Sequence, residues 1–162
     1  MKNRLHKFTL NRRQALLSGI SVLLIPVAAQ AQVQPGATLV EVWKSPSCGC
    51  CKDWIAHLEA SGFRAIVHDT GNAAMRSQLG IAPKYGSCHT ARVAGYAIEG
   101  HVPASDIRRL LKERPKAAGL AVPGMPVGSP GMDGREYGGR KDPYDVLLIA
   151  TDGNASIYQS HR

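Results

Sequence analysis

Acidic residues are absent from the first 31 residues of this 162-residue chain. The same segment holds five basic residues: Lys2, Arg4, Lys7, Arg12 and Arg13. The formal net charge of +8 therefore falls to +3 for the remainder of the chain. Because a nucleic-acid-binding protein carries its basic stripe on the folded domain, this distribution argues against nucleic acid as a partner.

Internal repeats are also absent, and no residue class is extreme. The chain is 44% hydrophobic and 20% charged, with 17 Gly and 10 Pro. These values exclude a coiled coil, a collagen and a wholly disordered chain. At roughly 100–200 residues per domain, the length favours a single domain.

An apolar run of membrane-spanning length is missing as well. The longest run, over residues 15–25, follows Arg13 and is shorter than the roughly 20 residues that a membrane helix needs. Ala29-Gln30-Ala31 then matches a small-x-small cleavage site. We expect residues 1–31 to be a cleaved export signal and residues 32–162 to form one domain in the periplasm, without a membrane span; an uncleaved anchor is the alternative.

The export route is left open by the sequence. Residues 11–17 loosely resemble a twin-arginine signal around Arg12 and Arg13, but the Phe that usually follows the pair is missing. Both the general secretory route and the twin-arginine route remain compatible with this segment.

The mature chain alternates between strand and helix patterns. Strands are predicted at 38–43, 63–68, 89–93 and 96–98, and helices at 51–62, 73–79 and from 103 or 105 to 115. The resulting order is β-α-β-α-β-β-α, which predicts an α/β fold. A Gly/Pro-rich stretch with little periodicity follows over 116–143, and a last hairpin is predicted from strands at 146–151 and 155–159.

Three of the four cysteines are clustered in Cys48-Gly49-Cys50-Cys51. Cys48 and Cys51 have the C-x-x-C spacing of thiol-disulfide oxidoreductases, at a strand–helix junction where the helix N-terminus favours the thiolate. One interpretation is therefore an enzyme with Cys48 as nucleophile and Cys51 as resolving thiol. A redox pair needs only two sulfurs, so Cys50 favours a shared cation instead.

Two structural interpretations of the cysteines also remain open. Four cysteines allow a framework of disulfides, although such a framework rarely places three of its cysteines on one turn. Zinc is a further possibility, but the usual zinc knuckle has two separated C-x-x-C pairs.

Other soft ligands lie further along the chain. Cys88 adjoins His89, His101 ends a predicted strand, and Met125 and Met132 lie in the Gly/Pro-rich stretch. Thiolate, thioether and imidazole together select Cu(I) over hard cations. The two methionines have an alternative role as anchors of the loop on the core, and a site role for His89 is left open.

Four segments together resemble one known family. They are Ser47-Cys48-Gly49-Cys50-Cys51, Ser87-Cys88-His89-Thr90-Ala91, Gly95-Tyr96-Ala97-Ile98-Glu99-Gly100-His101-Val102-Pro103 and Pro123-Gly124-Met125-Pro126-Val127-Gly128-Ser129-Pro130-Gly131-Met132. In this order and spacing they closely resemble the CopG-type family of periplasmic copper-resistance proteins, a metal-binding family. The resemblance spans residues 39–158 and implies a thioredoxin-like fold with copper bound by a cysteine cluster.

The resemblance also implies a set of copper ligands. By this resemblance the sulfur ligands are Cys48, Cys50, Cys51 and Cys88. Their neighbours in the site are His101, Met125 and Met132. Thioredoxins carry a cis-proline just before their third strand, whereas here Cys88 begins the corresponding strand. A fourth sulfur at that place favours metal handling over disulfide exchange.

From this we expect a protein that sequesters, transfers or redox-cycles copper in copper resistance. More than one Cu(I) ion is expected to bind, and other periplasmic copper-handling proteins are candidate partners. A copper or thiol oxidoreductase is the enzymatic alternative.

Overall fold

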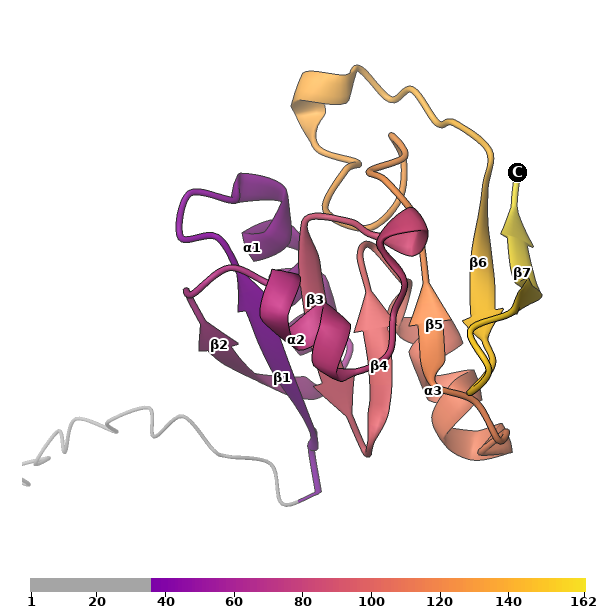
Figure 1. The fold of residues 1–162 in the computed structure, drawn as a ribbon. Helices are drawn as coiled ribbons and strands as arrows, with labels where there is room; N and C mark the ends of the chain where they lie inside the picture. Colours follow the sequence, from indigo (N-terminus) through magenta and orange to yellow (C-terminus); the bar gives the residue numbers. More distant parts are fainter. Residues whose placement is uncertain (1–35) are drawn as a thin grey trace, which may run out of the picture. The chain divides into compact units, whose positions relative to one another are not determined.

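The computed structural model describes residues 36–162, which contain one mixed seven-stranded sheet in the order β2-β1-β3-β4-β5-β6-β7 (Figure 1). The strands are β1 (Thr38–Lys44), β2 (Phe63–His68), β3 (His89–Val93), β4 (Tyr96–Glu99), β5 (Gly119–Ala121), β6 (Tyr144–Ile149) and β7 (Ala155–His161). The helices are α1 (Gly49–Ala60), α2 (Ala73–Gln78) and α3 (Ala104–Glu113), with short 3-10 turns η1 (Pro83–Tyr85) and η2 (Arg135–Tyr137). β1 pairs in parallel with β2, and β4 with β5; the other neighbours are antiparallel.

The sheet is covered on both faces. On one face, Trp54 and Leu58 of α1 and Leu110 of α3 pack in the main core. On the other, the segment after α2 contributes Ile81 to a smaller cluster. Successive strand residues face opposite sides, and each fully buried aliphatic side chain contributes about 1.5–3 kcal/mol. The two cores hold the sheet, and at its upper end in Figure 1 the chain passes from β1 to α1.

The predicted order of elements is confirmed through α3. The bounds of β2 and β3 coincide with the prediction, but α1 begins at Gly49 rather than at Cys51. Cys50 and Cys51 therefore lie in the first turn of α1. The predicted export signal lies outside the described residues, and no helix among residues 36–162 is both long and apolar enough to cross a membrane.

The sequence prediction missed β5, in the stretch assigned to a loop. β5 is three residues long and joins the β6–β7 hairpin to β4, so the hairpin extends the main sheet. Its first residue, Gly119, lies directly against the backbone of Ala97, where any Cβ would collide with the Ala97 carbonyl oxygen. A strand this short leaves no periodicity in the sequence, and only its partners define it.

Candidate metal centre

The topology brings all four cysteines together at one end of the sheet. Cys48 precedes α1, which follows β1, and Cys88 precedes β3, whose first residue pairs with the last residue of β1. The Sγ–Sγ distances are 3.6 Å for Cys48–Cys50, 3.8 Å for Cys50–Cys88 and 3.5 Å for Cys51–Cys88. All four sulfur atoms lie within 4.8 Å of one another, so they form one cluster.

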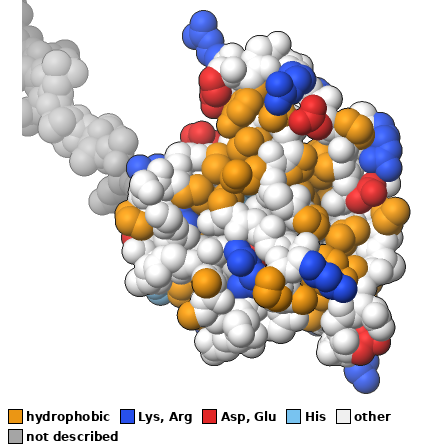
Figure 2. Space-filling model, turned by 45° about the horizontal axis from the view of Figure 1, so that its top comes forward, with side chains coloured by type: hydrophobic (Ala, Val, Ile, Leu, Met, Phe, Trp, Pro, Cys, Tyr) orange, Lys and Arg blue, Asp and Glu red, His pale blue; other side chains and the backbone are white. Residues whose placement is uncertain are grey.

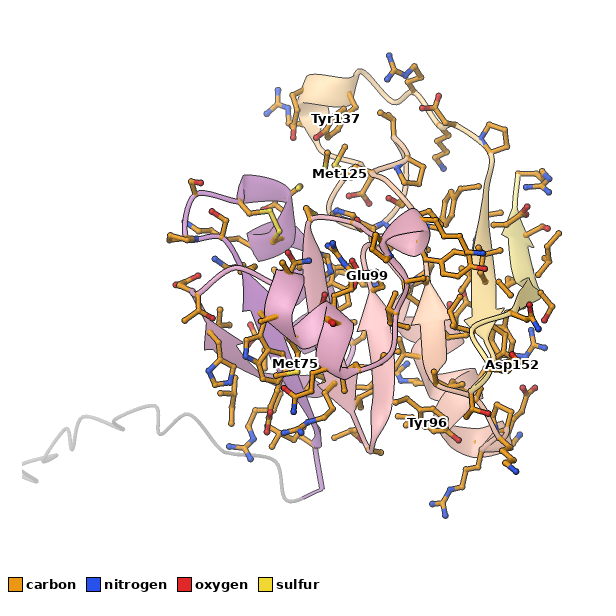
Figure 3. The ribbon with its side chains drawn as sticks, in the orientation of Figure 1. Met75, Tyr96, Glu99, Met125, Tyr137 and Asp152 are labelled. Atoms are coloured by element: carbon orange, nitrogen blue, oxygen red, sulfur yellow. A yellow bond between two sulfur atoms is a disulfide. The ribbon has the colours of Figure 1, made fainter. Side chains whose placement is uncertain are left out.

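Cys48 and Cys51 are joined by a disulfide, whose bond is drawn in yellow beside α1 in Figure 3. Cys50 and Cys88 are free thiols. Two of the four cysteines in the cluster are therefore oxidised and two are reduced. Since only the thiolate ligates a metal, Cys48 and Cys51 are able to ligate one only after the disulfide has taken up two electrons.

His101 faces the cluster with a defined ring nitrogen. Its Nδ1 lies 2.8 Å from the Pro130 carbonyl oxygen, and its Nε2 lies 3.1 Å from Cys88 Sγ. Because a carbonyl only accepts, Nδ1 carries the proton and the Nε2 lone pair points at the sulfur. Burial lowers the pKa of His101, so the ring is neutral at pH 7. Metal-ligating histidines are held in the same way, by donating the second ring N–H to a carbonyl.

His89, which the sequence left open, also contacts the cluster. Its Nδ1 lies 3.4 Å from Cys88 Sγ, and its ring packs on Trp54 with centroids 4.2 Å apart. Burial lowers the pKa of His89 well below its ordinary value. Within the described part of the chain Nε2 has no hydrogen-bond partner. Cys88, His89 and His101 thus form a second group of three ligand atoms within 4.8 Å.

The Gly/Pro-rich loop lies against the cysteine end of α1. A Cβ on Gly131 would come within 2.6 Å of both the Cys50 carbonyl oxygen and the Trp54 amide nitrogen, so only glycine permits this approach. Pro130, the preceding residue, holds His101. The loop therefore borders the cluster.

The two loop methionines differ in their surroundings. Met132 is 8% exposed, and its Sδ accepts a hydrogen bond of 3.4 Å from the Tyr137 hydroxyl. Met125 is 51% exposed, and Figure 3 places it above the ends of the strands, at the end that carries the cluster. Figure 2 shows hydrophobic side chains spread over this end of the molecule, with a few charged ones among them. Met132 is held by packing, whereas the Met125 thioether has solvent access.

Metal binding by this cluster is expected to weaken as the pH falls. Burial, reinforced by neighbouring Cys50, raises the pKa of the Cys88 thiol to about 12. Cys88 is therefore protonated at neutral pH without metal, and its ligation releases that proton. For each proton released, the affinity falls about tenfold per unit decrease in pH. Titrations between pH 6 and 8 measure this slope; a pH-independent affinity would exclude Cys88 as a ligand.

A buried ion pair lies next to the segment that carries Cys88 and was not predicted from the sequence. Glu99, which is fully buried, pairs with Arg76 of α2 at 2.8 Å. Glu99 was part of the motif at residues 95–103, but the sequence assigned it no role. Nothing in the sequence pointed to Arg76, because its role depends on where α2 packs.

Comparisons with known proteins indicate the family of the chain. A family described as a protein of unknown function, DUF411, matches residues 85–132. Two solved structures titled "Copper resistance protein copG", Form 2 and Form 1, are 45% and 46% identical to the chain. They cover 78% and 77% of this chain and 99% and 98% of their own, with TM-scores of 0.72 and 0.71. No curated protein matches the chain.

The fold and the cluster define a mixed α/β protein with a cysteine-histidine group able to hold a metal ion. The chain belongs to the CopG family of copper resistance proteins.

Proposed function

We propose that this protein binds Cu(I) through Cys48, Cys50, Cys51 and Cys88 and thereby acts in copper resistance. The observation that carries the proposal is the convergence of four sulfur atoms within 4.8 Å. Soft thiolates select Cu(I) over hard cations. The titles of the two similar structures support copper as the metal.

More than one ion fits this cluster. A thiolate has several lone pairs, so one sulfur bridges two soft ions. Neutral ligands complete the coordination without adding negative charge: the Nε2 of His101 already faces Cys88, and Met125 is the loop thioether with solvent access. Met132 would have to exchange its Tyr137 contact for an ion.

The setting that we propose is the periplasm, after removal of the predicted signal at residues 1–31. The β1-α1-β2 unit, with C-x-x-C at the start of α1 and the antiparallel β3–β4 pair beside it, supports a thioredoxin-like core. Copper is sequestered, passed to other copper-handling proteins or cycled between its oxidation states.

A second candidate function is thiol-disulfide exchange by Cys48 and Cys51. The disulfide between these two residues at the N-terminus of α1 favours it. The two functions differ in their need for Cys50, since an exchange reaction uses only the disulfide-forming pair.

The Cys50→Ser variant separates the two functions. Copper binding loses a ligand, so the Cu(I) affinity is expected to fall at least about 100-fold, since outer partners alone cost about 10–100-fold. Competition with a chromophoric Cu(I) chelator, without oxygen, measures it, and Ser47→Ala, an exposed neighbour, is the matched control. Unchanged copper affinity together with strong insulin reduction by the wild type would favour the exchange enzyme.

A further inference from the structure

Glu99 is a buried carboxylate whose hydrogen bonds converge on the segment that carries Cys88. Its Oε1 accepts from the Ser87 amide at 2.7 Å, and its Oε2 accepts from the Thr90 hydroxyl at 2.6 Å. Ser87 and Thr90 flank Cys88 and His89. One carboxylate therefore bonds the backbone on one side of the two residues that face the cluster and a side chain on the other side.

Arg76 and Asn72 hold the same segment from α2. Arg76 donates to Glu99 at 2.8 Å through Nε and to the Ser87 carbonyl at 2.5 Å through Nη2. The amide of Asn72 donates to the Ser87 carbonyl and to the Thr90 hydroxyl, each at 3.2 Å. The amide and the carbonyl of Ser87 are thus both engaged by charged side chains, which restricts rotation of the peptide planes next to Cys88.

Glu99 also lies where three segments of the site meet. It is two residues before His101, and its own carbonyl accepts from the Val122 amide at 2.9 Å, at the start of the loop. The Gly100 amide donates to the His89 carbonyl at 3.0 Å. Figure 3 shows Glu99 at the upper end of β4, at the same end of the sheet as the disulfide.

We propose that Glu99, neutralised by Arg76, is a positioning residue for the copper site: it fixes the Cys88 sulfur opposite the first turn of α1. A fully buried carboxylate loses its hydration, which is unfavourable. The donors that offset this loss are the Ser87 amide, the Thr90 hydroxyl and Arg76, which itself donates to the Ser87 carbonyl. This inference rests on the proposed copper binding, which it deepens by assigning a role to residues that do not touch the ion.

The test is the Glu99→Gln variant, which keeps the shape but removes the charge and one acceptor. The Cu(I) affinity is expected to fall about 10–100-fold, as for other outer partners of metal ligands. The matched control is Glu41→Gln, because Glu41 also forms an ion pair with an arginine, Arg92, at 2.7 Å, but that pair is partly exposed. The control is expected to leave the affinity unchanged.

A double-mutant cycle distinguishes positioning from general stability. In a Cys88→Ser background, Glu99→Gln is expected to change the affinity less than about twofold, because the residue it positions is already gone. An undiminished effect in that background overturns the proposal. If circular dichroism shows that Glu99→Gln does not fold, Thr90→Val replaces it, because this variant removes one donor to Glu99 and keeps the ion pair with Arg76. Thr90→Val is likewise expected to lower the Cu(I) affinity.

A metal-free readout separates this inference from the proposed function. In the apo protein, Glu99→Gln is expected to raise the alkylation rate of Cys88 by iodoacetamide, while the rate of Cys50 stays constant. Peptide mass spectrometry resolves the two thiols. If the wild type binds no Cu(I), the proposed function fails; equal Cys88 rates in variant and wild type overturn the positioning role independently.

Discussion

The triple variant Cys48→Ser, Cys50→Ser, Cys51→Ser is expected to lose Cu(I) affinity by at least about 10,000-fold, because loss of Cys50 alone is expected to cost at least about 100-fold and each further ligand at least about tenfold. Only Cys88 and the two histidines would then face the ion. Serine is nearly isosteric with cysteine but offers a hard oxygen, which Cu(I) disfavours. Competition against a chromophoric chelator, without oxygen, measures the loss.

The control for this variant is its fold. Cys51 is fully buried, so circular dichroism and thermal melting have to show that the variant remains folded. Wild-type copper content in the folded triple variant would contradict the cysteine cluster as the copper site.

Oxidation of the cluster is expected to have the second large effect. With the Cys48–Cys51 disulfide formed, two of the four sulfurs no longer act as thiolates, and the capacity for Cu(I) falls to that of Cys50, Cys88 and the histidines. Dithiothreitol, the reductant in the experiment, supplies two electrons and two protons to the disulfide and restores both thiols. We expect the reduced protein to bind more Cu(I) ions than the oxidised protein, by at least one ion.

Thiol counting defines the two states before each titration. The oxidised protein has two free thiols, on Cys50 and Cys88, and the reduced protein has four. A Cys48→Ser, Cys51→Ser variant cannot form this disulfide, so its copper capacity is expected not to respond to reduction of the pair. Equal capacities of oxidised and reduced wild type would show that Cys48 and Cys51 are not ligands.

Much of the fold was predictable because its signals are local. β2 and β3 have β-branched and apolar residues bounded by turn residues, and their bounds were predicted correctly. β5 was not predictable, because three residues carry no period and Gly119 is defined only by its approach to Ala97. The start of α1 was placed two residues late, because Gly49 and Cys50 have no strong helix preference.

The candidate site was predictable where its residues are of types that ligate metals, such as cysteine and histidine. The spacing of Cys48 and Cys51 and the Cys88-His89 pair are visible in the sequence. The structure places His101 Nε2 3.1 Å from Cys88 Sγ. The Glu99–Arg76 pair was not, since its two residues lie on α2 and β4 and meet only through packing. The different exposures of Met125 and Met132 likewise depend on how the loop folds back onto α1.

X-ray absorption at the copper edge of the reduced, Cu(I)-loaded protein tests the central claim most directly. A thiolate cluster predicts sulfur as the dominant neighbour of copper, with a nitrogen contribution from histidine and a copper–copper distance that reports bridging. A spectrum with only nitrogen and oxygen neighbours would contradict the account.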